Sequence, residues 1–408
     1  MVWPPPDAIH PTVTEMKPKR LWLLPILLIP LAGIAFVDWG AFGRLSDFDV
    51  GVAGDGTLDA VLRRIREKEG VPALGVLLIR DGKVVESGAV GVRAVGLPER
   101  VTVDDRWHLG SVTKPMTATL ATVLVEEGVI GWETTVGEVF AEFAETTRPE
   151  YAEVRLDELL AHTSGLPEKL TPIPAVPNSS ESTTPLVAQQ RRKWTSELLA
   201  LPPETPRGKH LYSNASYIVA GAMLEAVTGQ PWEELMQQHV FTPLGMTSTG
   251  FGPPGTVGES PDEPRGHRSV DGKLRPLQPN PKADNHPAVG PAGNVHTTLS
   301  DLAKFTAAHL AGLRGEGGLV TAETFKKLHT PAAGTRYSLG WNIRTHSHSG
   351  GHVLYHHGTN RFWYATVWLA PERKFAILIV TNAGDAVGQK GADVAIQAVT
   401  DRCNAAFE

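Results

Sequence analysis

Ser111 and Lys114 stand three residues apart and could form a nucleophile and its proton acceptor. A Ser-x-x-Lys pair carries little weight alone, since roughly one or two copies arise by chance in a chain this long. The neighbouring sequence strengthens it, because Pro115 suits the first turn of a helix and predicts a helix start at or just before Ser111. Residues three apart on a helix are neighbours, so the hydroxyl and the amine would meet.

The expected environment of this helix favours acyl-transfer chemistry. Residues 116–125 carry no charge and Gly128 supplies a stop, which predicts a buried helix. Burial lowers the pKa of a lysine and makes Lys114 a candidate general base. The unpaired backbone N–H groups of a helix N-terminus suit a developing oxyanion. The competing interpretation is a serine cap followed by a solvated lysine.

Two later segments carry polar groups beside expected helices and strands. Tyr212 and Asn214 follow a Pro/Gly-rich stretch and precede a helical pattern over residues 216–228. The sequence His-His-Gly-Thr at 356–359 leads into an aromatic and β-branched strand over 362–369. Each segment alone would be read as an ordinary cap or strand entry.

Taken in order, these segments resemble the serine β-lactamase and penicillin-binding protein superfamily, most closely its class C β-lactamase and esterase branch. The resemblance runs from about Leu58 to the C-terminus. Further similar phrases lie at 159–166 (Leu-Leu-Ala-His-Thr-Ser-Gly-Leu), 243–249, 291–298 and 300–305.

This resemblance implies a role for each matching residue. Ser111 would form an acyl-enzyme, and Lys114 would help to deprotonate it. Tyr212 would move protons between the serine, the leaving group and the attacking water, while Asn214 would orient the substrate. The expected activity is that of a serine hydrolase with no cofactor.

The third motif departs from the lactamase pattern. His356 stands where most β-lactamases have a lysine for the substrate carboxylate, and a neutral imidazole is a weaker partner for that group. Gly358 and Thr359 complete the motif as substrate-binding residues. By the same resemblance, the N–H groups of Ser111 and Thr359 would form the oxyanion hole. Arg361 could supply the missing charge, although a surface position is the simpler expectation.

The substrate stays open at this level. An ester, an amide, a D-alanyl peptide and a β-lactam all fit the implied chemistry, and the histidine lowers the expectation of efficient β-lactam hydrolysis. A catalytically silent, membrane-tethered binding or scaffold protein with the same fold is the alternative.

The predicted fold is α+β, an antiparallel sheet flanked by helices and built from both ends of the chain, with an inserted helical lobe over about 131–287. Other expected elements are a hairpin at Asp81-Gly82, a sheet segment at 338–341 and a strand over 374–381. Long Pro/Gly/Ser-rich excursions are expected at 170–185 and 252–287. Helices are expected over 58–68, 156–161, 195–201, 232–239 and 393–399.

The N-terminus predicts a membrane segment. Basic residues precede an uncharged apolar run over 21–37, which is just long enough to span a bilayer. We expect a cytoplasmic tail at 1–20, a transmembrane anchor at 21–37, a linker at 38–50 and a catalytic domain at 51–408 outside the cytoplasm. A cleaved signal sequence followed by export is the competing interpretation.

Composition narrows the possible partners. The formal net charge is −6 and no basic stripe occurs, so we expect an acyl substrate and the membrane as partners but no nucleic acid. Five histidines between 346 and 357 raise the possibility of a metal site, but no paired cysteines accompany them and we expect none. The single cysteine, Cys403, excludes an intramolecular disulfide.

Overall fold

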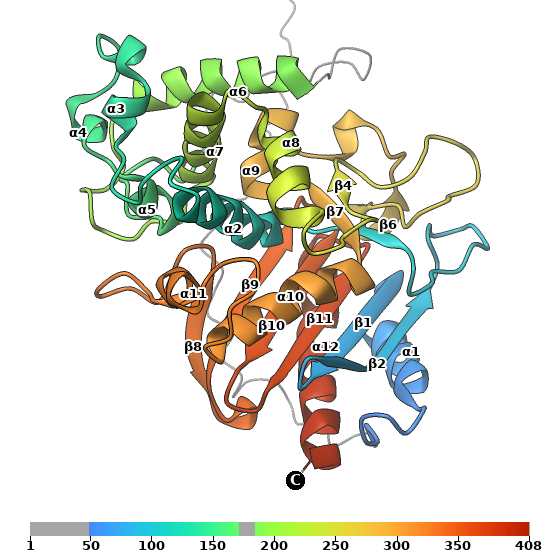
Figure 1. Ribbon diagram of the computed structural model, residues 1–408. Coiled ribbons are helices and arrows are strands. Elements are labelled where there is room, and N and C mark those ends of the chain that lie inside the picture. The colour runs from blue at the N-terminus through green and yellow to red at the C-terminus, as the bar shows by residue number, and fades with distance from the viewer. Residues whose placement is uncertain (1–48, 171–183, 408) are drawn as a thin grey trace, which may run out of the picture. The chain divides into compact units, whose positions relative to one another are not determined.

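The computed structural model describes residues 49–170 and 184–407 (Figure 1). The predicted tail and membrane segment, residues 1–37, lie outside the described residues. In the part that is described, no helix is both long enough and apolar enough to cross a bilayer.

A six-stranded antiparallel sheet organises the domain, in the order β2-β1-β11-β10-β9-β8. Because β1 pairs with β11, the two ends of the domain sequence meet in its middle. The predicted antiparallel sheet and its assembly from both chain ends are confirmed. Its strands are β1 (Ala73–Arg80), β2 (Lys83–Gly91), β8 (Asn342–His346), β9 (Gly351–Thr359), β10 (Tyr364–Ala370) and β11 (Phe375–Thr381).

A two-residue turn joins β1 to β2, as predicted. Asp81 and Gly82 have φ of 49° and 76°, the left-handed conformations of a tight hairpin turn. Such a turn matches the twist of the strands and fixes their register.

Helices cover both faces of the sheet (Figure 1). A Cβ on Gly88 of β2 would meet Leu58 and Leu62 of α1 (Leu58–Glu69), so α1 packs on that face, and α12 (Ala386–Phe407) packs beside it. Gly75 of β1 faces the other way, and a Cβ there would meet Leu299 of α10 (Leu299–Leu313). These close approaches explain why glycine stands at both strand positions.

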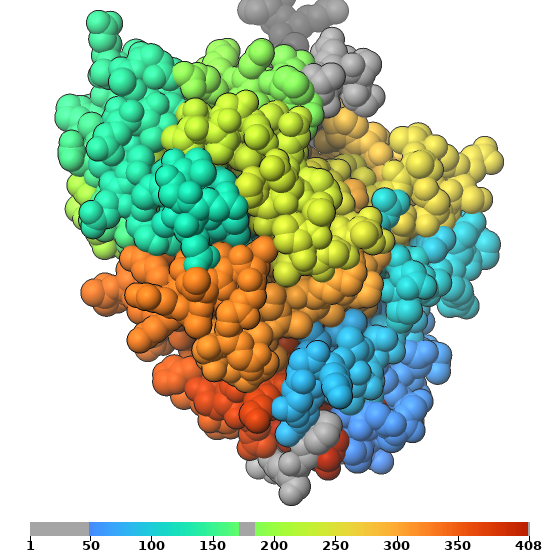
Figure 2. Space-filling model, in the orientation of Figure 1, coloured from blue at the N-terminus to red at the C-terminus, as the bar shows by residue number. Residues whose placement is uncertain are grey.

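A mostly helical region lies above the sheet in the view of Figure 1, and its residues (green to yellow) form their own part of the surface in Figure 2. Its central helix, α2, is buried on every side from Thr113 to Leu124. Burial all round matches the uncharged sequence of that helix. The helices are α2 (Thr113–Glu126), α3 (Val136–Val139), α4 (Pro149–Ala152), α5 (Leu156–Leu160), α6 (Thr184–Leu199), α7 (Asn214–Thr228), α8 (Trp232–Met236) and α9 (Gly290–Gly293), with α11 (Ala322–His329) packing on α2.

Two small sheets complete the described fold. The strands β3 (Arg106–His108), β7 (Val295–Thr298) and β4 (Gly250–Phe251) form one of them, in that order, next to the start of α2. The strands β5 (His267–Val270) and β6 (Lys273–Pro276) form a hairpin.

Several boundaries differ from the sequence expectations. The helix expected over 195–201 is the end of α6, which begins at Thr184, and α12 is much longer than 393–399. The excursion at 252–287 contains the β5–β6 hairpin. Most of the excursion at 170–185 lies outside the described residues.

The expected sheet segment at 338–341 is wrong. The chain turns there, and β8 begins at Asn342. Gly340 has a φ of 88°, which favours glycine. It also packs against the backbone of Pro115, where a Cβ would have no room.

Candidate active site

Ser111 lies in a short 3-10 turn, Gly110–Val112, that runs directly into α2. Gly110 has φ of 51°, and a Cβ at this position would collide with the backbone of Thr359 at the end of β9. The turn therefore packs tightly on the sheet. The Ser111 side chain is partly exposed at this junction, whereas the helix that follows is buried.

Lys114 has no exposed surface in the first turn of α2. Its Nζ lies 3.0 Å from Ser111 Oγ, 2.7 Å from Asn214 Oδ1 and 2.8 Å from the Ala292 carbonyl oxygen. Burial removes the amine from water and holds the pKa of Lys114 well below its ordinary value. A neutral amine has two N–H groups, which match the amide and carbonyl oxygens, and one lone pair, which is left for the Ser111 proton.

Tyr212 lies just before α7 and approaches the same lysine, whose Nζ is 4.8 Å from the centroid of the tyrosine ring. Burial raises the pKa of Tyr212, and a hydrogen bond with Ser111 offsets this only in part. The phenol is therefore protonated at neutral pH and can give a proton away. Ser111 lies between a neutral amine and a protonated phenol.

His356, on β9, takes a supporting position. It is 1% exposed, its Nδ1 donates to the His357 carbonyl oxygen at 2.7 Å, and its Nε2 lies 3.1 Å from the Tyr337 hydroxyl. With the proton on Nδ1, Nε2 accepts from Tyr337. Burial, followed by the nearby Lys114 amine, lowers the pKa of His356, so the ring is neutral. Protein groups engage both ring nitrogens, and the substrate contact expected of His356 stays a prediction.

Gly358 and Thr359 bring the end of β9 against the nucleophile. A Cβ on Gly358 would lie 2.7 Å from the Ser111 nitrogen, so only glycine allows this approach. Thr359 turns its hydroxyl away and donates it to the Gly384 carbonyl oxygen at 3.0 Å. Its backbone nitrogen lies against Gly110. The two N–H groups predicted to form the oxyanion hole thus come from opposite sides of one backbone contact.

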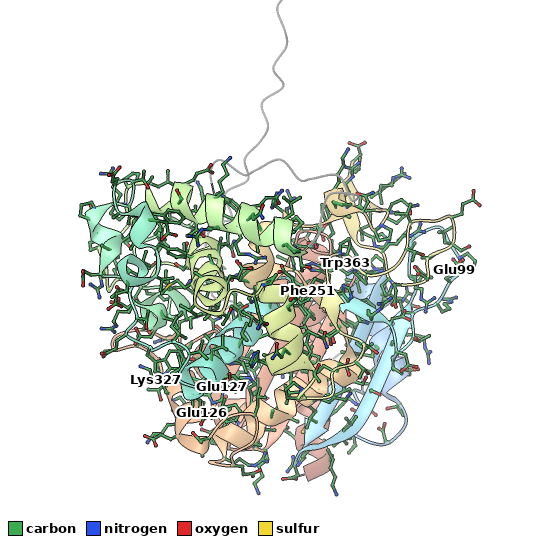
Figure 3. All side chains as sticks on the ribbon, turned by 45° about the horizontal axis from the view of Figure 1, so that its top comes forward. Glu99, Glu126, Glu127, Phe251, Lys327 and Trp363 are labelled. Atoms are coloured by element: carbon green, nitrogen blue, oxygen red, sulfur yellow. The ribbon has the colours of Figure 1, made fainter. Side chains whose placement is uncertain are left out.

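A buried pair that the sequence did not reveal lies beneath this contact. The Gly110 N–H donates to His108 Nδ1 at 3.1 Å, and His108 Nε2 lies 2.9 Å from Asp284 Oδ1. Asn360, next to Thr359, donates to the same oxygen at 2.9 Å. The His108 ring stacks on Trp363, which is labelled in Figure 3, with their centroids 5.6 Å apart.

These contacts connect the nucleophile turn to the segment after β9. No sequence pattern indicated them, because His108 stands among apolar residues and Asp284 lies in the Pro/Gly-rich excursion. Tyr337 was missed for the same reason, since its partner His356 becomes a neighbour only in the folded chain.

The remaining candidates lie apart from this cluster. Arg361 is exposed, and its guanidinium lies 5.4 Å from the centroid of its own neighbour, Phe362. Within residues 49–170 and 184–407, no three histidine, cysteine or acidic side chains are placed to hold a metal ion. His346 instead contacts the Ser349 hydroxyl at 2.8 Å, and His352 is exposed near Glu372.

Comparison with known proteins gives a family match and several similar proteins. The model of the Beta-lactamase family matches residues 58–400. Penicillin-binding protein 4 of Amycolatopsis lactamdurans is 26% identical over 336 residues, which cover 78% of this chain and 83% of that protein. An unguisins hydrolase of Aspergillus violaceofuscus is 24% identical, over 77% of this chain and 58% of its own length. A putative D-alanyl-D-alanine carboxypeptidase of Escherichia coli O157:H7 is 27% identical over 45% of this chain and 44% of its own length.

Solved structures share the fold. The penicillin-binding protein homologue from Pyrococcus abyssi superposes with a TM-score of 0.64 at 22% identity, covering 85% of this chain and 78% of that chain. The D-amino acid amidase from Ochrobactrum anthropi SV3 gives a TM-score of 0.65 at 21% identity, covering 83% and 97% respectively.

Proposed function

Because the chain belongs to the Beta-lactamase family, we propose that it is a serine hydrolase that forms an acyl-enzyme on Ser111. The observation that carries this proposal is the buried Lys114 amine, 3.0 Å from Ser111 Oγ and with no acidic hydrogen-bond partner among the residues that the structure describes. Such an amine can take a proton at neutral pH.

In the acylation step, the Lys114 lone pair takes the proton of Ser111 while Oγ attacks the substrate carbonyl carbon. The backbone N–H groups of Ser111 and Thr359 stabilise the oxyanion, and loss of one such donor typically costs about 100- to 1,000-fold in rate. The bond to the leaving group then breaks as Tyr212 gives it a proton, and the ammonium of Lys114 restores the proton of Tyr212.

In the deacylation step, the same groups act on water. The Tyr212 and Lys114 pair accepts a proton from the water as its oxygen attacks the acyl carbon, and Ser111 leaves with a proton. The net reaction consumes one water molecule and returns every enzyme group to its starting protonation state. No metal or cofactor takes part in these steps.

We favour uncharged esters and amides as substrates. A substrate carboxylate calls for a cation, and His356 is neutral with both ring nitrogens engaged. A D-alanyl peptide or a β-lactam is the second candidate, favoured by Arg361, the exposed cation three residues past Gly358. The names of a carboxypeptidase and an amidase among similar proteins fit either class.

Intact-mass measurement would test the proposal. The full-length chain would be exposed to a fluorophosphonate and, separately, to benzylpenicillin, with Ser111→Ala as the control. We expect a fluorophosphonate adduct that the control lacks. A penicillin adduct on Ser111 would favour the carboxylate-bearing substrates, and its rate of decay would separate hydrolysis from simple binding. No adduct with either reagent would favour a silent scaffold.

We also propose that residues 21–37 place the catalytic domain outside the cytoplasm, on the basis of the basic flank and apolar run alone. Protease protection of intact cells and sequencing of the mature N-terminus would test this. A mature chain that starts near residue 36 would replace the anchor with a cleaved signal.

A further inference from the structure

His162, in the phrase over 159–166, is joined to both neighbours of Tyr212. The Leu211 N–H donates to the His162 carbonyl oxygen at 2.8 Å, and the Ser213 N–H donates to His162 Nδ1 at 3.2 Å. Two hydrogen bonds from one residue therefore hold the chain on either side of the tyrosine.

The imidazole also packs against the tyrosine itself. The ring centroids of His162 and Tyr212 are 4.4 Å apart, and those of His162 and Tyr337 are 4.7 Å apart. His162 is 1% exposed. Its backbone and its ring thus fix the direction in which the phenol points from the chain.

The ring must be neutral to do this. Nδ1 accepts a hydrogen bond, so the proton of the neutral ring is on Nε2. Burial, with the nearby Lys114 amine as the next cause, holds the pKa of His162 well below its ordinary value. The contact with Ser213 is therefore maintained throughout the neutral range.

Two features of His162 oppose folding. Its φ is 58°, in the left-handed region that a non-glycine residue adopts at a cost of about 1 kcal/mol or more. Its Nε2 is buried and has no hydrogen-bond partner within residues 49–170 and 184–407, which is unfavourable for a polar group. A glycine or an asparagine would meet the backbone demand more easily.

We propose that His162 is a positioning residue that holds the Tyr212 hydroxyl beside Ser111. This inference rests on the proposed function, because it makes His162 a support for the proton transfer from Tyr212 to the leaving group. A loss of position of about 1 Å in a catalytic group can lower the rate about 100-fold.

The test uses the full-length chain and a p-nitrophenyl ester. His162→Gly accepts the left-handed backbone but removes the imidazole, and we expect kcat to fall by about 30- to 100-fold with little change in KM. His162→Asn tolerates the same φ, and its amide oxygen can accept the Ser213 N–H, so we expect kcat within about fivefold of the original. His352→Ala is the matched control, because His352 is an exposed histidine that lies apart from the site. Its variant should keep full activity.

A double-mutant cycle with Tyr212→Phe separates positioning from general stability. If His162 acts through Tyr212, adding His162→Gly to Tyr212→Phe should lower the remaining rate by no more than about twofold. Circular dichroism melting would verify that each variant is folded, and His162→Ala provides a second chain without the acceptor if the glycine variant does not fold.

Three results would overturn the inference. They are an unchanged kcat in His162→Gly and His162→Ala, an equal loss in His162→Asn and His162→Gly, and a full additional loss in the Tyr212→Phe background. A wild-type chain with no Ser111-dependent turnover would instead remove the proposed function itself, so the two failures can be told apart.

Discussion

Lys114, Arg191 and Arg402 are basic side chains with no exposed surface, and their surroundings differ sharply. Arg191 lies between Glu225 and Glu233, with a contact of 2.6 Å to Glu233. Lys114 contacts a hydroxyl, an amide oxygen and a carbonyl oxygen, none of them charged.

Arg402 follows the pattern of Arg191. Its guanidinium lies 2.8 Å from Glu86 and 3.0 Å from Asp55. Burial alone would lower the pKa of Arg402, but its hydrogen bonds to Glu86 and Asp55 outweigh burial and raise it. Burial lowers the pKa of Lys114, and no acid in the described part of the chain offsets this effect. The buried cations that hold the domain together are neutralised by acids, whereas the base in the candidate site is left to lose its proton.

Replacing Lys114, whose hydrogen-bond partners are all uncharged, should give the largest change in activity. Lys114→Met keeps the volume but removes the lone pair beside Ser111, so we expect turnover to fall by about 1,000-fold or more. The melting temperature should stay near the original, because no acid loses its partner. Ester hydrolysis and thermal melting would measure the two effects, with Ser111→Ala as the baseline. A large loss of stability would place Lys114 with the structural arginines.

Replacing a paired arginine should do the opposite. Arg191→Met leaves Glu225 and Glu233 buried without a cation, and we expect a loss of about 3–5 kcal/mol in the free energy of unfolding. Activity measured well below the melting temperature should persist. Urea denaturation would measure the loss, and the added changes Glu225→Gln and Glu233→Gln should restore much of it. No restoration would mean that packing, rather than charge, sets the effect.

The buried pair of His108 and Asp284 lies between these two cases, because it is an acid–base pair, like that of Arg191, but lies next to the nucleophile, like Lys114. Asp284→Ala removes the carboxylate that Asn360 and His108 share, so the turn before Ser111 and the end of β9 lose their common support. We expect kcat to fall about 10- to 100-fold. The affinity for an arylboronic acid, which mimics the oxyanion, should fall with it. An unchanged boronate affinity would show that the pair does not support the oxyanion hole.

Two further buried histidines, His329 and His296, extend the comparison to acid pH. Burial lowers the pKa of His329 to about 3 and that of His296 to about 4. Between these values and about 6.5, the unfolded chain binds more protons than the folded one, so stability falls as the pH falls. Each such histidine lowers the free energy of unfolding by up to about 1.4 kcal/mol for each pH unit in this range. Urea denaturation at pH 7 and pH 5 would measure this, and His329→Gln should flatten the dependence.

The sequence predicted elements with strong local signals. The turn at Asp81-Gly82 and the helix that contains Pro115 formed as expected, because glycine and proline limit the backbone wherever they stand. The start of α6 was missed because Arg191 occupies one position of its buried face and interrupts the apolar stripe. The turn at Gly340 depends on contact with Pro115, which no local pattern reports.

The same distinction applies to the candidate site. Ser111, Lys114 and Tyr212 were identified by type and order along the chain, and the structure places them together, with their catalytic roles still predictions. His108, Asp284 and Tyr337 were missed, because each acts on a partner far away in the sequence. The contact between the Tyr337 hydroxyl and His356 was not indicated by the sequence, and the part of His356 in substrate binding stays a prediction.

The pairing of β1 with β11 has a consequence for the order of events during synthesis. Ser111, in its 3-10 turn, and Lys114, on α2, leave the ribosome long before β9, β10 and β11 are made. Until those strands exist, β1 has no central partner, and the Thr359 N–H cannot face the serine. Such distant pairings form late, after a large loss of chain entropy. A nascent or truncated chain that lacks β9 to β11 would therefore carry Ser111 without the Thr359 N–H, and we expect the proposed hydrolysis only from chains in which β11 has been made.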